Sequence, residues 1–179
     1  MRSNLLFLFP LLVIAGTGVR SVEAQPAPDW VVANWKNLIG VWIADNSAYK
    51  TEEASMDSFG LEWTWGIGNQ SLVGRLYGIK DGEEVATFWE FREFWHPGEQ
   101  RLLTTQFGRD GTYGAGPHHQ NADGSTEMLQ TFYDAATGRA TRVGHRAVLK
   151  ADEHTTQSFD VDESGTWKER RTYIWRRQR

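Results

Sequence analysis

The stretch from Val85 to Trp95 constrains the fold of this chain more strongly than any other. Five of its eleven residues are aromatic, and turn-forming residues flank it at 80–83 and 96–98. Aromatic side chains favour the pleated, half-buried surface of a sheet, so the stretch predicts one long strand. Both faces of that strand carry rings and charges, with Glu93 on one face and Glu90 and Arg92 on the other. A wide barrel with a partly polar interior accounts for this mixture, but the alternation does not say which face points inward.

Turn signals such as Asp81-Gly82 and Thr137-Gly138 recur at regular spacing through the rest of the chain. They separate ten predicted strands: 39–44, 59–65, 71–79, 84–95, 101–107, 112–118, 126–133, 139–150, 154–161 and 166–176. Short links join antiparallel neighbours, and closing such a meander removes its two exposed edges. We therefore predict an all-β protein, a closed antiparallel up-and-down barrel of about ten strands around a cavity. An open sheet or a sandwich is the alternative.

A short helix is predicted before the first strand, with Asp29 as its cap and Leu38 near its end. The strand that follows contains Gly40-Val41-Trp42. A helix leading into a Gly-x-Trp strand resembles the opening of lipocalin-like barrels of the calycin superfamily, and the chain is similar to their small exported bacterial members. The resemblance implies that Trp42 closes the bottom of the barrel and that Gly40 lets backbones approach closely. The second Gly-x-Gly that haem-binding nitrobindin-like barrels usually show does not follow here.

The first 24 residues are typical of a secretory signal peptide. Arg2 precedes an apolar run from Leu5 to Gly16, and small residues surround Ala24. We expect cleavage there, leaving 25–179 as one lipocalin-like β-barrel domain without a stable membrane anchor. Uncleaved, the run would be an anchor, although Pro10 and the glycines make it short for a membrane span. The chain has no cysteine, and an exported protein without disulfides fits a bacterial periplasm or secretion.

Composition and motifs exclude several classes of function. The chain has 19 basic and 23 acidic residues, and removal of 1–24, which hold two arginines and one glutamate, leaves a net charge of −5. This charge gives no reason to bind nucleic acid or anionic lipid. No phosphate loop, nucleophile elbow or dinucleotide fingerprint is present. His118 and His119 would point to opposite faces of a strand and could not easily bind one ion, so we expect no metal. We expect no cofactor either.

The last predicted strand carries the clearest site hypothesis. One face holds Trp167, Glu169, Arg171, Tyr173 and Trp175, and the other holds Lys168, Arg170, Thr172, Ile174 and Arg176. The second face suits solvent, so the first is predicted to face the interior. An inward Glu169 and Arg171 would be costly unless they pair or serve a ligand. Arg171-Thr172-Tyr173 resembles the Arg-x-Tyr of fatty-acid-binding proteins, which grips a carboxylate. A purely structural Arg–Glu pair at the barrel mouth is the alternative.

Other predicted cavity residues come from the same alternation. Trp63 and Trp65 share one face of their strand, and His145 lies on a mostly apolar face. His145 would be a proton-transfer group or a haem ligand, although a hydrogen-bonded core histidine is the simpler interpretation. The full predicted ligand-binding set is Arg171, Tyr173, Glu169, Trp63, Trp65, His145, Trp89 and Trp167.

These features lead to an exported binding protein that holds a small apolar or aromatic ligand in its barrel, with Arg171 favouring an acidic group. The main alternative is a cofactor-free barrel enzyme of the lyase, decarboxylase or cyclase type. In that enzyme Glu169 would be the base, Tyr173 the acid and Arg171 the anion clamp. A haem-binding barrel that uses His145 is a third hypothesis. The sequence leaves catalysis and oligomeric state open.

Overall fold

The computed structural model describes residues 26–53 and 55–179, so the predicted signal peptide at 1–24 lies outside the described residues. The elements are α1 (Asp29–Leu38), β1 (Gly40–Asp45), β2 (Ser58–Trp65), β3 (Ser71–Lys80), β4 (Glu83–His96), β5 (Arg101–Gly108), β6 (Tyr113–Gln120), β7 (Thr126–Tyr133), β8 (Ala140–Leu149), β9 (Glu153–Val161) and β10 (Trp167–Arg177), with short 3₁₀ turns η1 (Ser47–Tyr49) and η2 (Ile67–Asn69). Each predicted strand is present, with its ends within two residues of the prediction.

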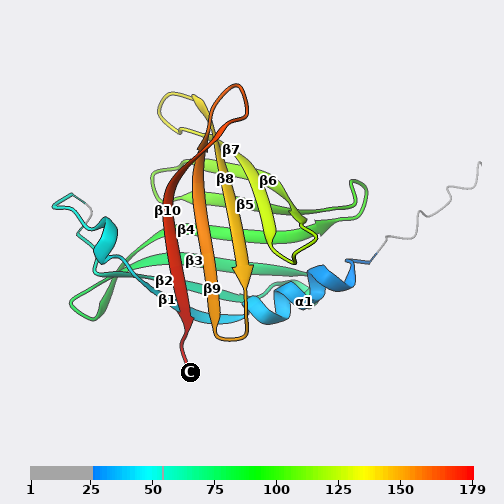
Figure 1. Ribbon diagram of the computed structural model, residues 1–179, viewed down its shortest axis with the longest axis horizontal. Helices are drawn as coiled ribbons and strands as arrows, with labels where there is room; N and C mark the ends of the chain where they lie inside the picture. Colours follow the sequence, from blue (N-terminus) through cyan, green and yellow to red (C-terminus); the bar gives the residue numbers. More distant parts are fainter. Residues whose placement is uncertain (1–25, 54) are drawn as a thin grey trace, which may run out of the picture.

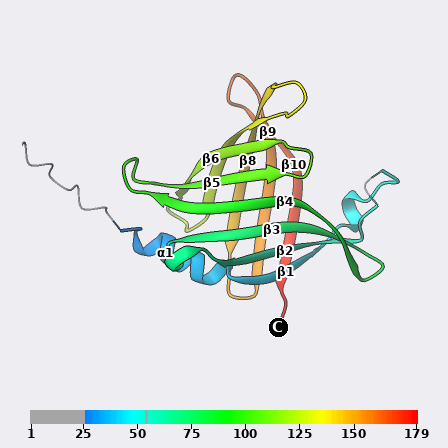
Figure 2. The ribbon, with the colours of Figure 1, turned by 180° about the vertical axis from the view of Figure 1, so that it is seen from behind.

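The ten strands form one closed barrel. Each strand pairs antiparallel with the next, and β10 returns to pair with β1. In Figure 1, strands β8 to β10 lie in front. Figure 2 shows the barrel from behind, where strands β2 to β6 lie in front. The seam between β1 and β10 is short, joining Trp42–Ala44 to Trp175–Arg177. The predicted closed up-and-down barrel is therefore confirmed.

Helix α1 closes one end of the barrel. Its residues Val31, Trp35 and Leu38 are buried in the core cluster, because they recur at the helical spacing that puts them on one face. Trp42 is fully buried at this end, donates Nε1–H to the carbonyl of Leu38 at 2.8 Å, and lies under the Arg177 guanidinium at 4.1 Å from the ring centroid. Trp42 thus lies where the Gly-x-Trp pattern placed it. No helix among the described residues is long and apolar enough to cross a membrane.

The start of α1 differs from the prediction. The helix follows Pro28, and no side chain in the described part of the chain caps it. Asp29 is the first helical residue, where the helix dipole favours a negative charge. Asp29 therefore supports the helix through its charge, and the predicted capping role was wrong.

The opposite end of the barrel, here called the mouth, is bordered by the segment that consists of residues 46–53 and 55–57. Asn46 anchors this segment: it is 1% exposed, donates to the carbonyl of Met56 at 2.9 Å, and accepts a hydrogen bond from the Tyr173 hydroxyl at 2.8 Å. The Tyr49 hydroxyl accepts from the backbone N–H of Thr172 at 2.8 Å and donates to its carbonyl at 3.2 Å. Thr172 lies on β10 beyond the short seam with β1, so Tyr49 satisfies backbone groups that β1 does not reach.

A β-bulge changes which residues of β10 face the interior. The register against β9 shifts between Glu169 and Arg171, which leaves Arg170 as the extra residue. A bulge places two residues opposite one, so the alternation of faces is interrupted at that point. After the bulge, Arg171 and Tyr173 line the cavity. The prediction was correct for these two residues.

Before the bulge the prediction was wrong. Glu169 lies on the outer side, where it accepts a hydrogen bond from the Thr172 hydroxyl at 2.7 Å. Trp167 also lies outside, packed against Phe159 and over Gly144, where an added Cβ would come within 2.4 Å of its ring. Neither Trp167 nor Glu169 lines the cavity.

The structure also decides the orientation of β4. Trp89, Phe91 and Glu93 line the cavity, whereas Glu90 and Arg92 are exposed on the outer face. Glu93 is therefore the residue that β4 contributes to the partly polar interior that the mixed strand predicted.

Candidate functional site

The barrel encloses a cavity of about 530 Å³. Its wall from β2 to β4 is mainly apolar and includes Phe59, Leu61, Trp63, Leu76, Trp89 and Phe91. Most of its polar residues lie on β5 to β10: Thr104, Gln106, His118, His145, His154, Thr156, Ser158, Arg171 and Tyr173. Asn34 and Leu38 of α1 contribute at the closed end. The cavity thus offers an aromatic side and a hydrogen-bonding side to the same occupant.

The aromatic wall is held in fixed ring geometry. Trp63 stacks on Phe91 with centroids 5.4 Å apart and planes 27° from parallel, and Trp89 meets Phe132 edge to face at 5.6 Å. Gly74 makes room for Trp63, since a Cβ there would lie 2.5 Å from the indole. Trp63 and Trp89 therefore line the cavity as predicted.

Trp65 does not line the cavity. It packs edge to face against Trp35 of α1, with centroids 6.2 Å apart, at the closed end of the barrel. The alternation of side chains correctly predicted that Trp65 shares a face with Trp63, but helix α1 occupies this end of the barrel and covers Trp65.

Arg171 and Tyr173 lie together at the mouth. The Arg171 guanidinium is 5.7 Å from the centroid of the Tyr49 ring and is exposed to solvent. Burial raises the pKa of Tyr173 above its usual value, and the charge and hydrogen bond of Arg171 oppose that rise. Within residues 26–53 and 55–179, Arg171 makes no ion pair with a carboxylate. A cation beside aromatic rings, without a counterion of its own, can hold an anionic group.

The neighbouring Arg170 has a different environment. It approaches Asp160 at 3.4 Å and contributes to the rim of the cavity. The prediction that Arg170 faces only solvent was wrong, because the bulge turns it toward the mouth.

Glu93, Thr104 and His118 form a polar cluster that the sequence analysis missed. The Thr104 hydroxyl lies 3.1 Å from Oε2 of Glu93 and 2.6 Å from Nε2 of His118. Oε2 of Glu93 and Nε2 of His118 are 3.5 Å apart. Trp35 donates Nε1–H to Oε1 of Glu93 at 2.7 Å. Glu93, Thr104 and His118 all line the cavity.

Burial controls the protonation of this cluster. It raises the pKa of Glu93 to about 7, against the lowering effect of the bonds from Trp35 and Thr104. It lowers the pKa of His118 to about 4, helped by the nearby His119. Although the two groups are close enough for an ion pair, burial disfavours both charges. His118 is therefore neutral at pH 7, while Glu93 gains and loses its proton near neutrality.

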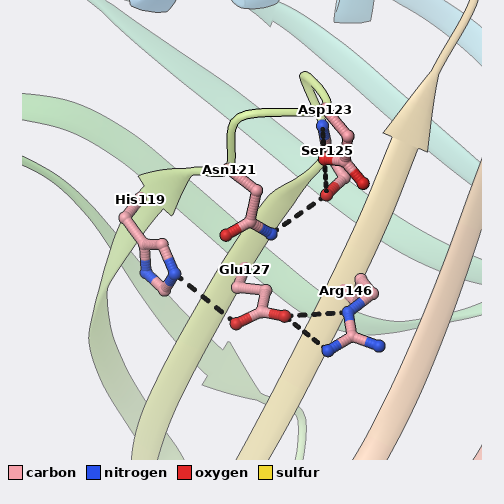
Figure 3. A network of polar contacts seen from close by, with 6 residues as sticks. All are labelled: His119, Asn121, Asp123, Ser125, Glu127 and Arg146. Carbon is pink, nitrogen blue, oxygen red and sulfur yellow. Dashed lines mark hydrogen bonds and ion pairs between the residues drawn. The ribbon is translucent and has the colours of Figure 1, made fainter.

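His118 and His119 do point to opposite faces, as the strand alternation predicted. His119 lies on the outside with 64% of its side chain exposed and approaches Glu127 at 3.4 Å, and Arg146 donates to the same carboxylate at 2.8 Å (Figure 3). The alternation along each strand left the inward face of β4 undecided, and the structure places both Glu93 and His118 in the cavity. Their proximity could not be read from the sequence, because it depends on the register across β5.

His145 lines the cavity as predicted, between Met128 on β7 and Ser158 on β9. Burial is the main cause that lowers the pKa of His145 to about 4. Its Nε2 is buried and has no hydrogen-bond partner among the described residues, and the same holds for Nδ1 of His154 and Nε1 of Trp63, two other lining residues. An unpartnered buried polar group costs about 1–3 kcal/mol, so an occupant with hydrogen-bonding groups would find favourable contacts here. The role of His145 as a haem ligand stays a prediction.

Among the residues that the structure describes, no group of three or more His, Cys, Asp or Glu side chains is arranged to hold a metal ion. No protein-family model matches the chain, and no curated protein is significantly similar to it. The fold and site define a closed ten-strand antiparallel barrel with an internal cavity, an architecture consistent with the calycin or lipocalin-like fold.

Proposed function

We propose that this protein is an exported, lipocalin-like binding protein that holds a small, flat aromatic molecule with an acidic group. The observation that carries the proposal is the cavity of about 530 Å³, with aromatic rings on one side and the Arg171 guanidinium at its mouth.

The size and lining of the cavity support a ligand of one to three rings. Ligand pockets usually have volumes of about 300–1,000 Å³ and mainly apolar walls with a few polar groups. The stacked pair of Trp63 and Phe91 offers a flat surface to such a ligand. Aromatic contacts of this kind contribute about 0.5–1.5 kcal/mol beyond the area that they bury.

The polar wall and the mouth support oxygen-bearing substituents. Thr156, Ser158 and Gln106 line the side facing the rings, and their hydroxyl and amide groups can orient a ligand. Arg171 is suited to a carboxylate or a similar anion. Solvent reaches Arg171, so its ionic contribution is expected to be modest, about 1 kcal/mol.

The segment 1–24 supports the proposed location, the periplasm or the extracellular medium. The test is N-terminal sequencing of the protein recovered from its own host. The mature chain should begin at or near Gln25, and a membrane-bound chain that keeps residues 5–16 would contradict export.

Binding of an acid is tested by titration with 1-naphthoate, followed through tryptophan fluorescence, in the wild type and in Arg171→Met. We expect the variant to bind about five- to tenfold more weakly, since it loses about 1 kcal/mol or slightly more. The matched control is Arg176→Met on the same strand, because Arg176 is exposed and bonded to Glu153 outside the cavity.

A neutral ligand sharpens this comparison. 1-Naphthalenemethanol has the same rings without the negative charge, so its affinity should be the same in the wild type and in Arg171→Met. Equal losses of naphthoate affinity in Arg171→Met and Arg176→Met, or no saturable binding of either compound to the wild type, would contradict the proposal.

A further inference from the structure

We propose that the cavity also contains a proton-transfer centre, in which His118 is the catalytic base and passes a proton through Thr104 to Glu93. Its substrate would be a small aromatic carbonyl compound with a C–H bond next to the carbonyl group. This inference rests on the proposed function, because the substrate would occupy the same cavity as the ligand.

The geometry sets the direction of the hydrogen bonds. The Thr104 hydroxyl has one proton, and its carboxylate neighbour Glu93, at 3.1 Å, can only accept when ionised. Thr104 then accepts from Nε2 of His118 at 2.6 Å. With Glu93 ionised, the His118 ring therefore carries its hydrogen on Nε2, and Nδ1 keeps a free lone pair.

The free nitrogen is accessible from the cavity. His118 lines the cavity, with 12% of its side chain exposed. The contacts of His118 among the described residues are made by Nε2, and none of these residues forms a hydrogen bond with Nδ1. Nδ1 does not belong to the fully buried nitrogen atoms that lack a partner, so it is not sealed off from the cavity. A substrate in the cavity can therefore present an acidic hydrogen to Nδ1.

The other end of the relay is fixed by the helix. Glu93 is 2% exposed, and Trp35 of α1 donates to its Oε1 at 2.7 Å. This leaves Oε2 directed at Thr104. Thr104 and Glu93 would act through His118 and do not need to touch the substrate, so they are positioning and relay residues.

The proposed step moves only protons and needs no cofactor. The substrate C–H bond breaks, and its proton goes to Nδ1 of His118. Its electron pair forms a C=C bond as the carbonyl oxygen takes the negative charge. The Nε2 proton of His118 moves to Thr104, and the Thr104 hydroxyl proton moves to Glu93. Reversal of these transfers returns a proton to carbon.

The electrostatics of the cluster favour a relay, in which Glu93 holds the proton, over a mechanism in which His118 itself stays protonated. Burial keeps the pKa of His118 at about 4, so a buried imidazolium is unfavourable, whereas Glu93, with a pKa of about 7, readily accepts a proton. In the relay His118 stays neutral and Glu93 takes the proton. The other titratable groups near His118 are His119 on the outer face and His145 across β7.

The test uses 2-indanone, a planar aromatic ketone, in D₂O. Proton NMR follows the exchange of its α-hydrogens for deuterium, and tryptophan fluorescence measures its binding separately. The wild type should accelerate exchange in a saturable way. His118→Gln should lose about 100-fold or more of the catalysed rate, within the range for a general base, and Thr104→Val, which keeps the shape and removes the hydroxyl, should lose about tenfold. His119→Gln, one residue away on the outer face, should match the wild type.

A pH profile separates the relay from a structural role of Glu93. The catalysed rate should rise with pH as Glu93 ionises near 7, and Glu93→Gln should show a lower rate without that rise. Exchange by the wild type no faster than in buffer, or equal rates in wild type and folded His118→Gln, would overturn the proton-transfer centre. Fluorescence titration with 1-naphthoate in the same samples decides independently whether the binding function survives.

Discussion

Trp35 of α1 donates its indole N–H to Glu93 of β4 across 2.7 Å. The helix that closes the barrel is thereby tied to a carboxylate that lines the cavity and is 2% exposed. This bond couples the packing of the closed end to the protonation of Glu93.

Replacing Trp35 with Phe tests that coupling. The variant loses the donor and leaves a buried carboxylate oxygen without a partner, so the free energy of unfolding should fall by about 1–3 kcal/mol for the bond, in addition to the smaller ring. The loss should be larger at pH 8, where Glu93 is ionised, than at pH 5. Urea denaturation at both pH values measures it, and an equal loss at both would show that the bond does not favour the ionised form.

Glu93 should make the protein less stable as pH rises toward neutrality. Its pKa is about 7 in the folded protein and 4.5 ordinarily, so between these values the folded state keeps a proton that the unfolded chain has lost. The free energy of unfolding should therefore fall by up to about 3 kcal/mol from this group as pH rises from 4.5 to 7. Glu93→Gln should remove that decrease, and its stability relative to the wild type should be greater at pH 8 than at pH 5. The prediction fails if urea midpoints of the two proteins differ by the same amount at both pH values.

The buried histidines have the opposite effect. His118, His145 and His154 have pKa values of about 4, against 6.5 ordinarily. Below 6.5 the unfolded chain binds protons that the folded protein excludes, so stability should fall as pH drops from 6.5 to 4, by up to about 3 kcal/mol per histidine. His154→Gln should flatten this dependence in denaturant titrations at pH 7 and 5. A variant that follows the wild-type dependence would mean that His154 becomes protonated without unfolding.

Asn46 should hold residues 46–53 and 55–57 at the mouth. Asn46→Ala removes both the bond to Met56 and the acceptor of the Tyr173 hydroxyl, so we expect a loss of about 1–3 kcal/mol in unfolding free energy. Hydrogen exchange of the backbone amides at 46–57 should become faster, with little change in β5 to β7. Unchanged exchange in this segment would contradict the anchoring role.

The fold could be predicted from the sequence because local signals repeat along the chain. Turn residues such as Asp81-Gly82 and Thr137-Gly138 separate the strands, and the long aromatic stretch matches β4. Trp63, His145, Arg171 and Tyr173 were placed in the cavity by the alternation of side chains, which is fixed by strand geometry, whereas the inward face of the strand that carries Trp89 was decided only by the structure.

The errors arise where local alternation fails or where distant strands meet. The bulge at Arg170 puts Glu169 and Trp167 outside, and no residue type in that strand marks the bulge in advance. The cluster of Glu93, Thr104 and His118 joins β4, β5 and β6 through their register, which the sequence of each strand alone does not specify.

If a small aromatic acid binds inside the barrel, a side chain that fills the cavity should abolish its binding. Ala147 lines the cavity on β8, so Ala147→Trp would place an indole in the space that the ligand needs. Isothermal titration calorimetry with 1-naphthoate should give one binding site in the wild type and no measurable binding in a folded Ala147→Trp. Equal affinity in the two proteins would show that the acid binds outside the barrel.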